Sequence, residues 1–420
     1  MNSVIEDLKI TKFREGLTQT GLAFRKDILE NVEQVLNTTD FPTTRDERWK
    51  YTRVTKISNK IFNEQGGGSI SELSLPLKDA FTIVFVNGVY EASLSSSESQ
   101  EGITITPLSQ LKENSILGTV TGTRTDIFTA LNTMYAADGI AIEVKAKAVV
   151  EKPVQVVHML KGEGVIANFR TLIVADKFAE AAITQVFLSE AAVSSFTNVV
   201  TEVIVGENAK ITLDKIQYES EENFHIAAEY IRQAASSNFK INTITLNGGL
   251  VRNNLFIDVE GQNVETHLNG AYILKGNQHV DNHTTVDHLQ ANCESNELYK
   301  GVVDDTATAV FNGKVFVRKD AQKINAYQSN GNVLLSDTAA INSKPELEIY
   351  ADDVKCSHGS TTGQLDEEAV FYLRARGLSE KSARALMVTA FISDVIDKVD
   401  NEETIDYIHS ILEERFGWSF

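Results

Sequence analysis

The spacing of apolar residues changes twice along the chain. In the first 63 residues they recur at helical intervals, as at Ile28, Val32 and Leu36. From about residue 139 to 360 short β-rich runs alternate with turns of Asp, Asn and Gly, and after Gly363 the helical interval returns. The pattern predicts a mainly β core between two helical regions: a mixed N-terminal domain at 1–138, the core at 139–362 and a helical C-terminal domain at 363–420.

Turns containing Asp recur in the second half of the predicted core, at Asp305, Asp320, Asp337 and Asp352. They are roughly 15 to 17 residues apart, and we expect each interval to hold about two short strands with their turns. Such a short period is typical of coils stacked along an axis, because one coil cannot bury its apolar face alone. The pattern favours a β-helix and leaves a β-sandwich as the alternative.

Shorter signals predict individual elements. Asn87-Gly88 stands between apolar runs and predicts a tight hairpin, because both residues tolerate positive φ. In the last region DEEAVFYLRARG has acidic residues in its first turn and Gly377 at its end, as expected of a helix. Ser379 is placed to cap a second helix, and a third follows Asn401.

Composition narrows the classes of function. A formal charge of -19 opposes binding to nucleic acid phosphates or to anionic lipid, so protein or small-ion partners are expected. The two cysteines, Cys293 and Cys356, are too few for a disulfide framework or a self-contained four-thiolate cluster. No apolar stretch reaches about 18 residues, and we expect a soluble cytoplasmic protein. The sequence lacks a phosphate-binding loop, a dinucleotide fingerprint and a nucleophile elbow, so any ATPase activity must come from a partner.

Cys356 and His358 form the first candidate site. In an extended strand Val354, Cys356 and His358 project to the same face, which brings a thiol and an imidazole together. Two ligands fall short of the four that a cluster needs, so the others would come from another chain. The alternative is a small buried hydrophobe beside a structural histidine.

A second candidate group consists of His279, Asp281 and His283, which alternate along one predicted strand, with His288 further on. Imidazole and carboxylate ligands suit zinc or ferrous iron. The alternative is that these side chains satisfy backbone groups next to turns.

The segment FPTTRDERWKYT joins aromatic and basic residues near the N-terminus. It either forms a binding patch with cation–π contacts or is an ordered linker packed on the helical region. The residues concerned are Arg45, Arg48, Trp49, Lys50 and Tyr51.

Several segments together resemble the SufD proteins of the SufB/SufD family. They include FPTTRDERWKYT, NHTTVDH, ELYKGV, FNGKVFVR and KPELEIYADDVKCSHGSTTGQLDEEAVFYLRARG, and they are densest from about residue 279 to 377. SufB is usually longer and richer in cysteine, so two cysteines favour SufD. The alternatives are the paralogous SufB subunit and a self-sufficient metal-binding β-helix protein.

The resemblance implies a right-handed parallel β-helix flanked by helical domains. It implies a non-catalytic scaffold of the SufBCD iron–sulfur cluster assembly complex, paired with SufB through the β-helix and coupled to the ATPase SufC, with no nucleotide bound by this chain. A transient cluster would form at the interface with SufB, where His358 and Cys356 match the family motif. It leaves open a reduced flavin in the complex and a homodimer of the lone subunit. The C-terminal helices would dock SufC around Phe371, Tyr372, Leu373, Arg374 and Arg376.

Overall fold

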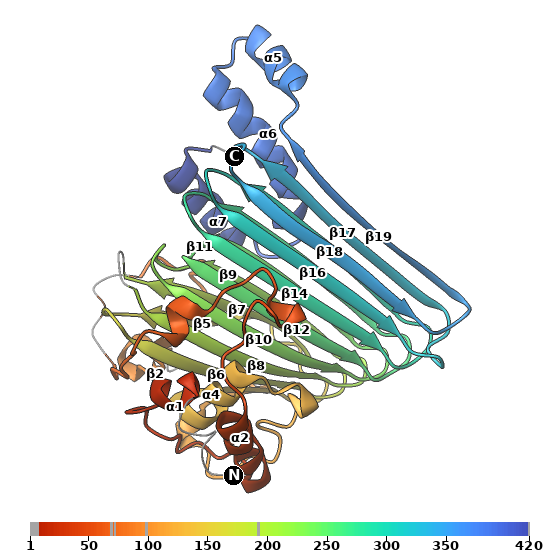
Figure 1. Cartoon of the computed structure of the whole chain (residues 1–420). Helices are drawn as coiled ribbons and strands as arrows, with labels where there is room; N and C mark the ends of the chain where they lie inside the picture. Colours follow the sequence, from red (N-terminus) through yellow and green to blue (C-terminus); the bar gives the residue numbers. More distant parts are fainter. Residues whose placement is uncertain (1–7, 68–69, 71–72, 97–99, 191–193, 419–420) are drawn as a thin grey trace.

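The computed structural model describes residues 8–67, 70, 73–96, 100–190 and 194–418. The chain is mainly β and forms a parallel β-solenoid of about 8 turns with helices at both ends. Figure 1 shows the strands stacked side by side, with the N-terminal helices near one end of the stack and the C-terminal helices near the other. The predicted β-helix core between helical regions is confirmed, and the sandwich alternative is not.

The strands belong to two sheets. One consists of β1 (Phe81–Val86), β2 (Val89–Tyr90), β5 (Val154–Leu160), β7 (Glu180–Ser189), β9 (Lys210–Tyr218), β11 (Asn238–Asn247), β13 (Glu265–Leu274), β15 (Glu294–Val303), β17 (Ile324–Leu334) and β19 (Val354–Gln364). The other consists of β3 (Ile103–Pro107), β4 (Asp138–Val144), β6 (Ile166–Ala175), β8 (Phe196–Val205), β10 (Phe224–Gln233), β12 (Leu250–Val259), β14 (His279–His288), β16 (Thr308–Val317) and β18 (Ala340–Ile349). From β4 onward successive strands alternate between the two sheets, so that two strands make one coil.

The helices lie outside the solenoid, and most are short at the N-terminal end. The α-helices are α1 (Lys9–Phe13), α2 (Lys26–Thr38), α3 (Thr55–Ser58), α4 (Ile127–Tyr135), α5 (Glu367–Ala375), α6 (Glu380–Ile396) and α7 (Glu402–Phe416). The 3-10 helices are η1 (Glu47–Trp49), η2 (Ala92–Leu94), η3 (Leu108–Gln110) and η4 (Gly122–Arg124).

The repeat is longer than the sequence prediction. His279 lies opposite Thr308, 29 residues later, so a coil is about twice the expected interval. Between Asp305 and Asp320 lies one strand, β16, where two short strands were expected. The prediction of two strands per interval is wrong, because each strand crosses the full width of the solenoid and is 10 residues long in β16.

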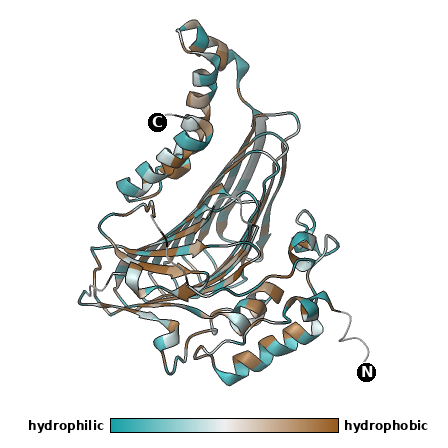
Figure 2. Cartoon of the chain, turned by 90° about the vertical axis from the view of Figure 1, so that its left-hand side faces the viewer, coloured by the Kyte–Doolittle hydropathy of each residue, from teal (hydrophilic) through white to brown (hydrophobic). Residues whose placement is uncertain are grey.

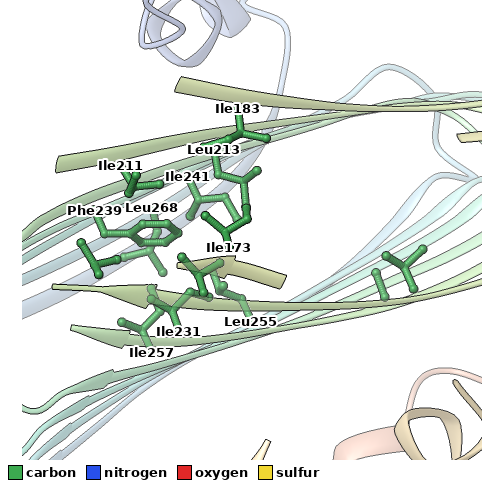
Figure 3. Close-up of a cluster of buried hydrophobic side chains, with 14 of the residues drawn as sticks. Ile173, Ile183, Ile211, Leu213, Ile231, Phe239, Ile241, Leu255, Ile257 and Leu268 are labelled. Carbon is green, nitrogen blue, oxygen red and sulfur yellow. The ribbon is translucent and has the colours of Figure 1, made fainter. Parts of the chain in front are cut away.

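The main core lies between the two sheets. Along β9, Ile211 and Leu213 alternate with residues of the outer face and point inward, as the period of two requires. Figure 3 shows such side chains from both sheets facing one another, among them Phe239 and Leu255. Each fully buried aliphatic or aromatic side chain contributes about 1.5–3 kcal/mol to folding.

The outer faces are covered by helices from opposite ends of the chain. Phe128 of α4 and Phe13 of α1 pack on Phe196 of the nine-stranded sheet. Ile392 of α6 and Ile408 of α7 belong to a separate apolar cluster with the outer face of the ten-stranded sheet. Figure 2 shows the two groups of helices on different sides of the solenoid. This cover explains why the central strands are buried on both faces.

Local predictions of turns and helix ends are confirmed. β1 and β2 form an antiparallel hairpin across Asn87 (φ 51°) and Gly88 (φ 82°). Ser379 accepts a hydrogen bond from the backbone N–H of Ser382 at the start of α6, and Asn401 caps α7 in the same way. Gly377 has φ 99°, a conformation that ends α5 because residues with a Cβ rarely adopt it.

Candidate functional site

The last coil of the solenoid carries Cys356 and His358. Both lie on β19, which ends the ten-stranded sheet and pairs with β17 along one edge. Along its other edge β19 pairs with no strand of the described residues, and the same is true of β18 in the nine-stranded sheet. The backbone groups of both edges are therefore available to another chain.

Cys356 and His358 share the inward face of β19, as their spacing predicts. Cys356 is opposite Ala326 and packs, half-buried, against the core with Val354. Burial raises the pKa of the Cys356 thiol, so a metal or a neighbouring cation would be needed to favour the thiolate. His358 is exposed, because no further coil covers it. A thiol and an imidazole thus lie on the same face of the last strand at the end of the solenoid.

Behind His358 lies a polar pair that sequence reasoning did not single out. Glu297 and Gln328 occupy the same register position in the two preceding coils, and Gln328 Nε2 donates a hydrogen bond to Glu297 Oε2 at 2.9 Å. In the sequence, Gln328 and Glu297 could have been recognised only by their spacing from His358, which is one coil for Gln328 and two coils for Glu297. Recognising that spacing needs the coil length, which only the structure supplies.

The four residues of the second candidate group lie on two different faces of β14. His279, Asp281 and His283 share one face of β14, as predicted, and His283 Nε2 lies 2.9 Å from Asp281 Oδ1. His288 points to the opposite face, where its Nε2 lies 3.0 Å from Ser295 Oγ, and burial lowers its pKa to about 4. Among the described residues no group of three or more His, Cys, Asp or Glu side chains could hold a metal ion.

Asp281 is bound mainly by residues from outside its own strand. Arg252 and Thr52 both donate hydrogen bonds to its carboxylate, and Thr52 Oγ1 also lies 2.8 Å from His279 Nε2. Burial opposes ionisation of Asp281, but Arg252 and His283 hold its pKa well below the usual range. This network ties the N-terminal segment to β12 and β14.

The segment around Trp49 is an ordered linker packed on the molecule. Trp49 is buried and its ring lies 5.4 Å from that of Phe128 in α4, as the linker interpretation expects. Its other contact is with the solenoid, because the Arg252 guanidinium lies 3.8 Å from the Trp49 ring. Cation–π contacts are present here, but they hold the segment in place. Tyr51 is 44% exposed and lies 5.4 Å from Lys50 Nζ.

Helix α5 exposes large apolar side chains. Phe371 is 70% exposed and Tyr372 is 56% exposed, values that are unusual for aromatic residues. Arg376 lies 4.9 Å from the ring of Tyr372, and Arg374 is 3.4 Å from Glu380. Leu373 is half-buried. Figure 1 shows α5 standing away from both sheets at the far end of α6.

Sequence comparison matches nearly the whole chain to two family models. The SufBD protein N-terminal region matches residues 12–156, and the SUF system FeS cluster assembly, SufBD core domain matches residues 158–391. The chain belongs to the SufBD family. It therefore belongs to a family of iron–sulfur cluster assembly proteins of the SUF system.

Relatives within the SufBD family cover most of the chain. An iron–sulfur cluster assembly SufBD family protein of Synechocystis is 32% identical over 394 residues, 88% of this chain and 86% of the relative. The iron–sulfur cluster assembly protein SufD of Escherichia coli is 29% identical over 381 residues, 89% of this chain and 88% of the relative. The chloroplastic protein ABCI7 of Arabidopsis thaliana is 28% identical over 400 residues, 90% of this chain and 83% of the relative. In the described part of this SufBD protein, no helix is long and apolar enough to cross a membrane.

Proposed function

We propose that this SufBD protein is a SufD-type scaffold subunit of the SufBCD complex. It contributes Cys356 and His358 to a nascent iron–sulfur cluster that forms at an interface with SufB. The cluster is the cargo of the complex and not a resident cofactor of this chain. ATP hydrolysis belongs to SufC, so this chain acts without catalysing a reaction of its own.

One observation carries the proposal: Cys356 and His358 lie on the last coil, where the solenoid ends with two unpaired strand edges in the described residues. Strand edges of this kind pair readily with a second chain. A second solenoid docked there would bring its own ligands next to this pair. Two ligands from each chain would complete the four that a cluster needs.

The exposed surface of α5 supports docking of the ATPase. Phe371 and Tyr372 are exposed and adjacent, and two arginines follow them on the C-terminal side, of which Arg376 lies 4.9 Å from the ring of Tyr372. Aromatic residues and arginines are enriched in the centres of protein interfaces. Motion of SufC would reach the solenoid through α6 and α7, which pack on its outer face.

The proposed setting is the cytoplasm, where a reducing environment keeps the two free cysteines as thiols. A reduced flavin is retained as a candidate cofactor of the assembled complex, and a homodimer as a candidate state of the isolated subunit.

Anaerobic co-expression with SufB and SufC tests the proposal. We expect a complex that contains all three proteins and forms a cluster when given iron and sulfide. The chain alone should hydrolyse no ATP and retain no cluster, because half of a ligand shell leaves iron open to water. A stoichiometric, long-lived cluster on the isolated chain would contradict the shared site.

A further inference from the structure

Three inward-facing residues form a column through the last three coils. Glu297 of β15 is opposite Gln328 of β17, and Gln328 is opposite His358 of β19. Neighbouring strands are about 4.8 Å apart, and paired residues of parallel strands point to the same side. The three side chains are therefore stacked in adjacent coils, with the exposed imidazole at the outer end.

The inner end of the column is a buried carboxyl. Glu297 is 5% exposed, and it accepts hydrogen bonds from Thr284 Oγ1 at 2.5 Å and from Gln328 Nε2 at 2.9 Å. Burial raises the pKa of Glu297 to about 7, while these two donors favour the ionised form. Glycine at 313 leaves room for the pair, because a Cβ there would lie 2.9 Å from Glu297 Oε2 and 3.0 Å from Gln328 Nε2.

Of the two polar side-chain atoms of Gln328, the middle residue, one is hydrogen-bonded and the other is not. Gln328 is 4% exposed, and its Nε2 is bound to Glu297. Its Oε1 is buried and has no hydrogen-bond partner among the residues that the structure describes. A buried carbonyl oxygen without a donor is destabilising, so a donor is expected on the far side of Gln328 from Glu297.

The neighbouring polar groups are already occupied. Ser343 Oγ donates to Asn330 Oδ1 at 2.7 Å, and Ser360 Oγ donates to Ser343 Oγ at 2.7 Å. The imidazole of His358 makes no hydrogen bond to any of the described residues, and the strand register places it beside Gln328, so the ring can turn toward that side chain.

We propose that Gln328 is a positioning residue for His358: its carbonyl oxygen, oriented by Glu297, accepts the imidazole N–H and leaves the other ring nitrogen unprotonated toward the interface. This inference rests on the proposed function, in which His358 is a ligand. An imidazole that donates one N–H to a protein acceptor is held in one tautomer, and its second nitrogen can bind iron or a sulfur-bearing iron species.

The tautomer of His358 in the isolated full-length chain is the direct test. Histidine labelled with ¹⁵N and ¹³C would be observed by NMR at pH 8, with His358 assigned from the signal missing in His358→Asn. We expect one dominant tautomer in the wild type. In Gln328→Leu the ratio should move at least threefold, toward that of free histidine.

Glu297→Gln tests the direction of the hydrogen bonds along the column, because it exchanges an acceptor for a donor at nearly constant side-chain volume. The new amide would donate to Gln328 Oε1, so Gln328 would turn its NH₂ toward His358, which could then only accept. We expect the opposite tautomer in this variant. Gln364→Leu makes the same chemical change as Gln328→Leu on the exposed part of β19, and it should leave the His358 signals unchanged.

A steric variant covers the case in which Gln328→Leu does not fold. Gly313→Ala keeps every polar group and places a methyl group 2.9 Å from Glu297 Oε2, 3.0 Å from Gln328 Nε2 and 2.8 Å from Cζ of Phe311. It should disturb the hydrogen bond between Glu297 and Gln328 and shift the same tautomer ratio. Unchanged tautomer populations in the folded variants would overturn the inference.

Cluster formation separates this inference from the function on which it rests. In the complex with SufB and SufC, Gln328→Leu should slow cluster formation about 10-fold with normal assembly, as loss of an outer-shell partner typically does. A shifted tautomer together with full activity of His358→Ala would leave the Gln328–His358 bond standing and overturn the proposed function. If the tautomer is unshifted in Gln328→Leu but His358→Ala is inactive, the proposed function stands and the Gln328–His358 bond is overturned.

Discussion

The guanidinium of Arg252 lies 3.8 Å from the ring of Trp49 and also donates a hydrogen bond to the carboxylate of Asp281. One side chain thus holds the N-terminal linker against the solenoid and neutralises a buried charge. Both Arg252 and Asp281 are at most 1% exposed.

Arg252→Met should lower the free energy of unfolding by about 3 kcal/mol, because it leaves the Asp281 carboxylate buried without its main counter-charge. Urea denaturation would measure the loss. Arg318→Met is the matched control: Arg318 binds Asp287 but is 46% exposed, and Arg124 also lies 3.9 Å from Asp287. The control should cost less than about 1 kcal/mol, and equal losses would contradict the assigned role of Arg252.

His358→Ala should lower cluster formation by the complete complex at least 10-fold, because it removes a proposed ligand. The complex should still assemble, because the imidazole is exposed and its loss leaves no gap in the packing. The readout is the visible absorbance of the cluster in anaerobic reconstitution. Cys293→Ser is the control and should have a smaller effect, since Cys293 is buried and its Sγ lies 3.3 Å from the carbonyl oxygens of Gly261 and Ala291, to either of which the thiol can donate. Loss of the complex itself in His358→Ala would count against the assignment.

The paired change Phe371→Asp and Tyr372→Asp should weaken binding of SufC at least 10-fold, because it places charge in the centre of the proposed docking surface. Point changes are preferred to deletion of the C-terminal region, since removing α6 and α7 would expose the apolar outer face of the ten-stranded sheet. Ile61→Asp alters a residue that is 62% exposed at the other end of the chain and should leave SufC binding unchanged. Binding would be measured by calorimetry.

Glu297→Gln should make stability less dependent on pH. The pKa of Glu297 is raised from 4.5 to about 7, so its contribution to stability is present below pH 4.5 and is lost as pH rises through 7. The neutral amide of the variant does not titrate, so its free energy of unfolding lacks this loss. Between pH 5 and pH 8 the free energy of unfolding of the variant should rise by about 2 kcal/mol relative to that of the wild type. The comparison needs urea unfolding at both pH values, and a constant difference would show that Glu297 does not titrate in this range.

Local sequence patterns by themselves determined much of the fold. The period of two placed Cys356 and His358 on one face of a strand, and Asn87-Gly88 marked a hairpin, because both features depend only on neighbouring backbone. The helix cap at Ser379 followed in the same way from a side chain that bonds within one turn. Short-period repetition favoured stacked coils over a sandwich for a related reason, since each coil needs a neighbour.

Tertiary structure alone decided the contacts between coils. The column of Glu297, Gln328 and His358 depends on the register of three strands about 30 residues apart, and the short Asp spacing suggested a different coil length. The binding of Thr52 and Arg252 to Asp281 joins segments whose own patterns say nothing of each other. Hydrophobic periodicity specifies which side of an element is buried, but the partner that covers it is selected by packing of the whole chain.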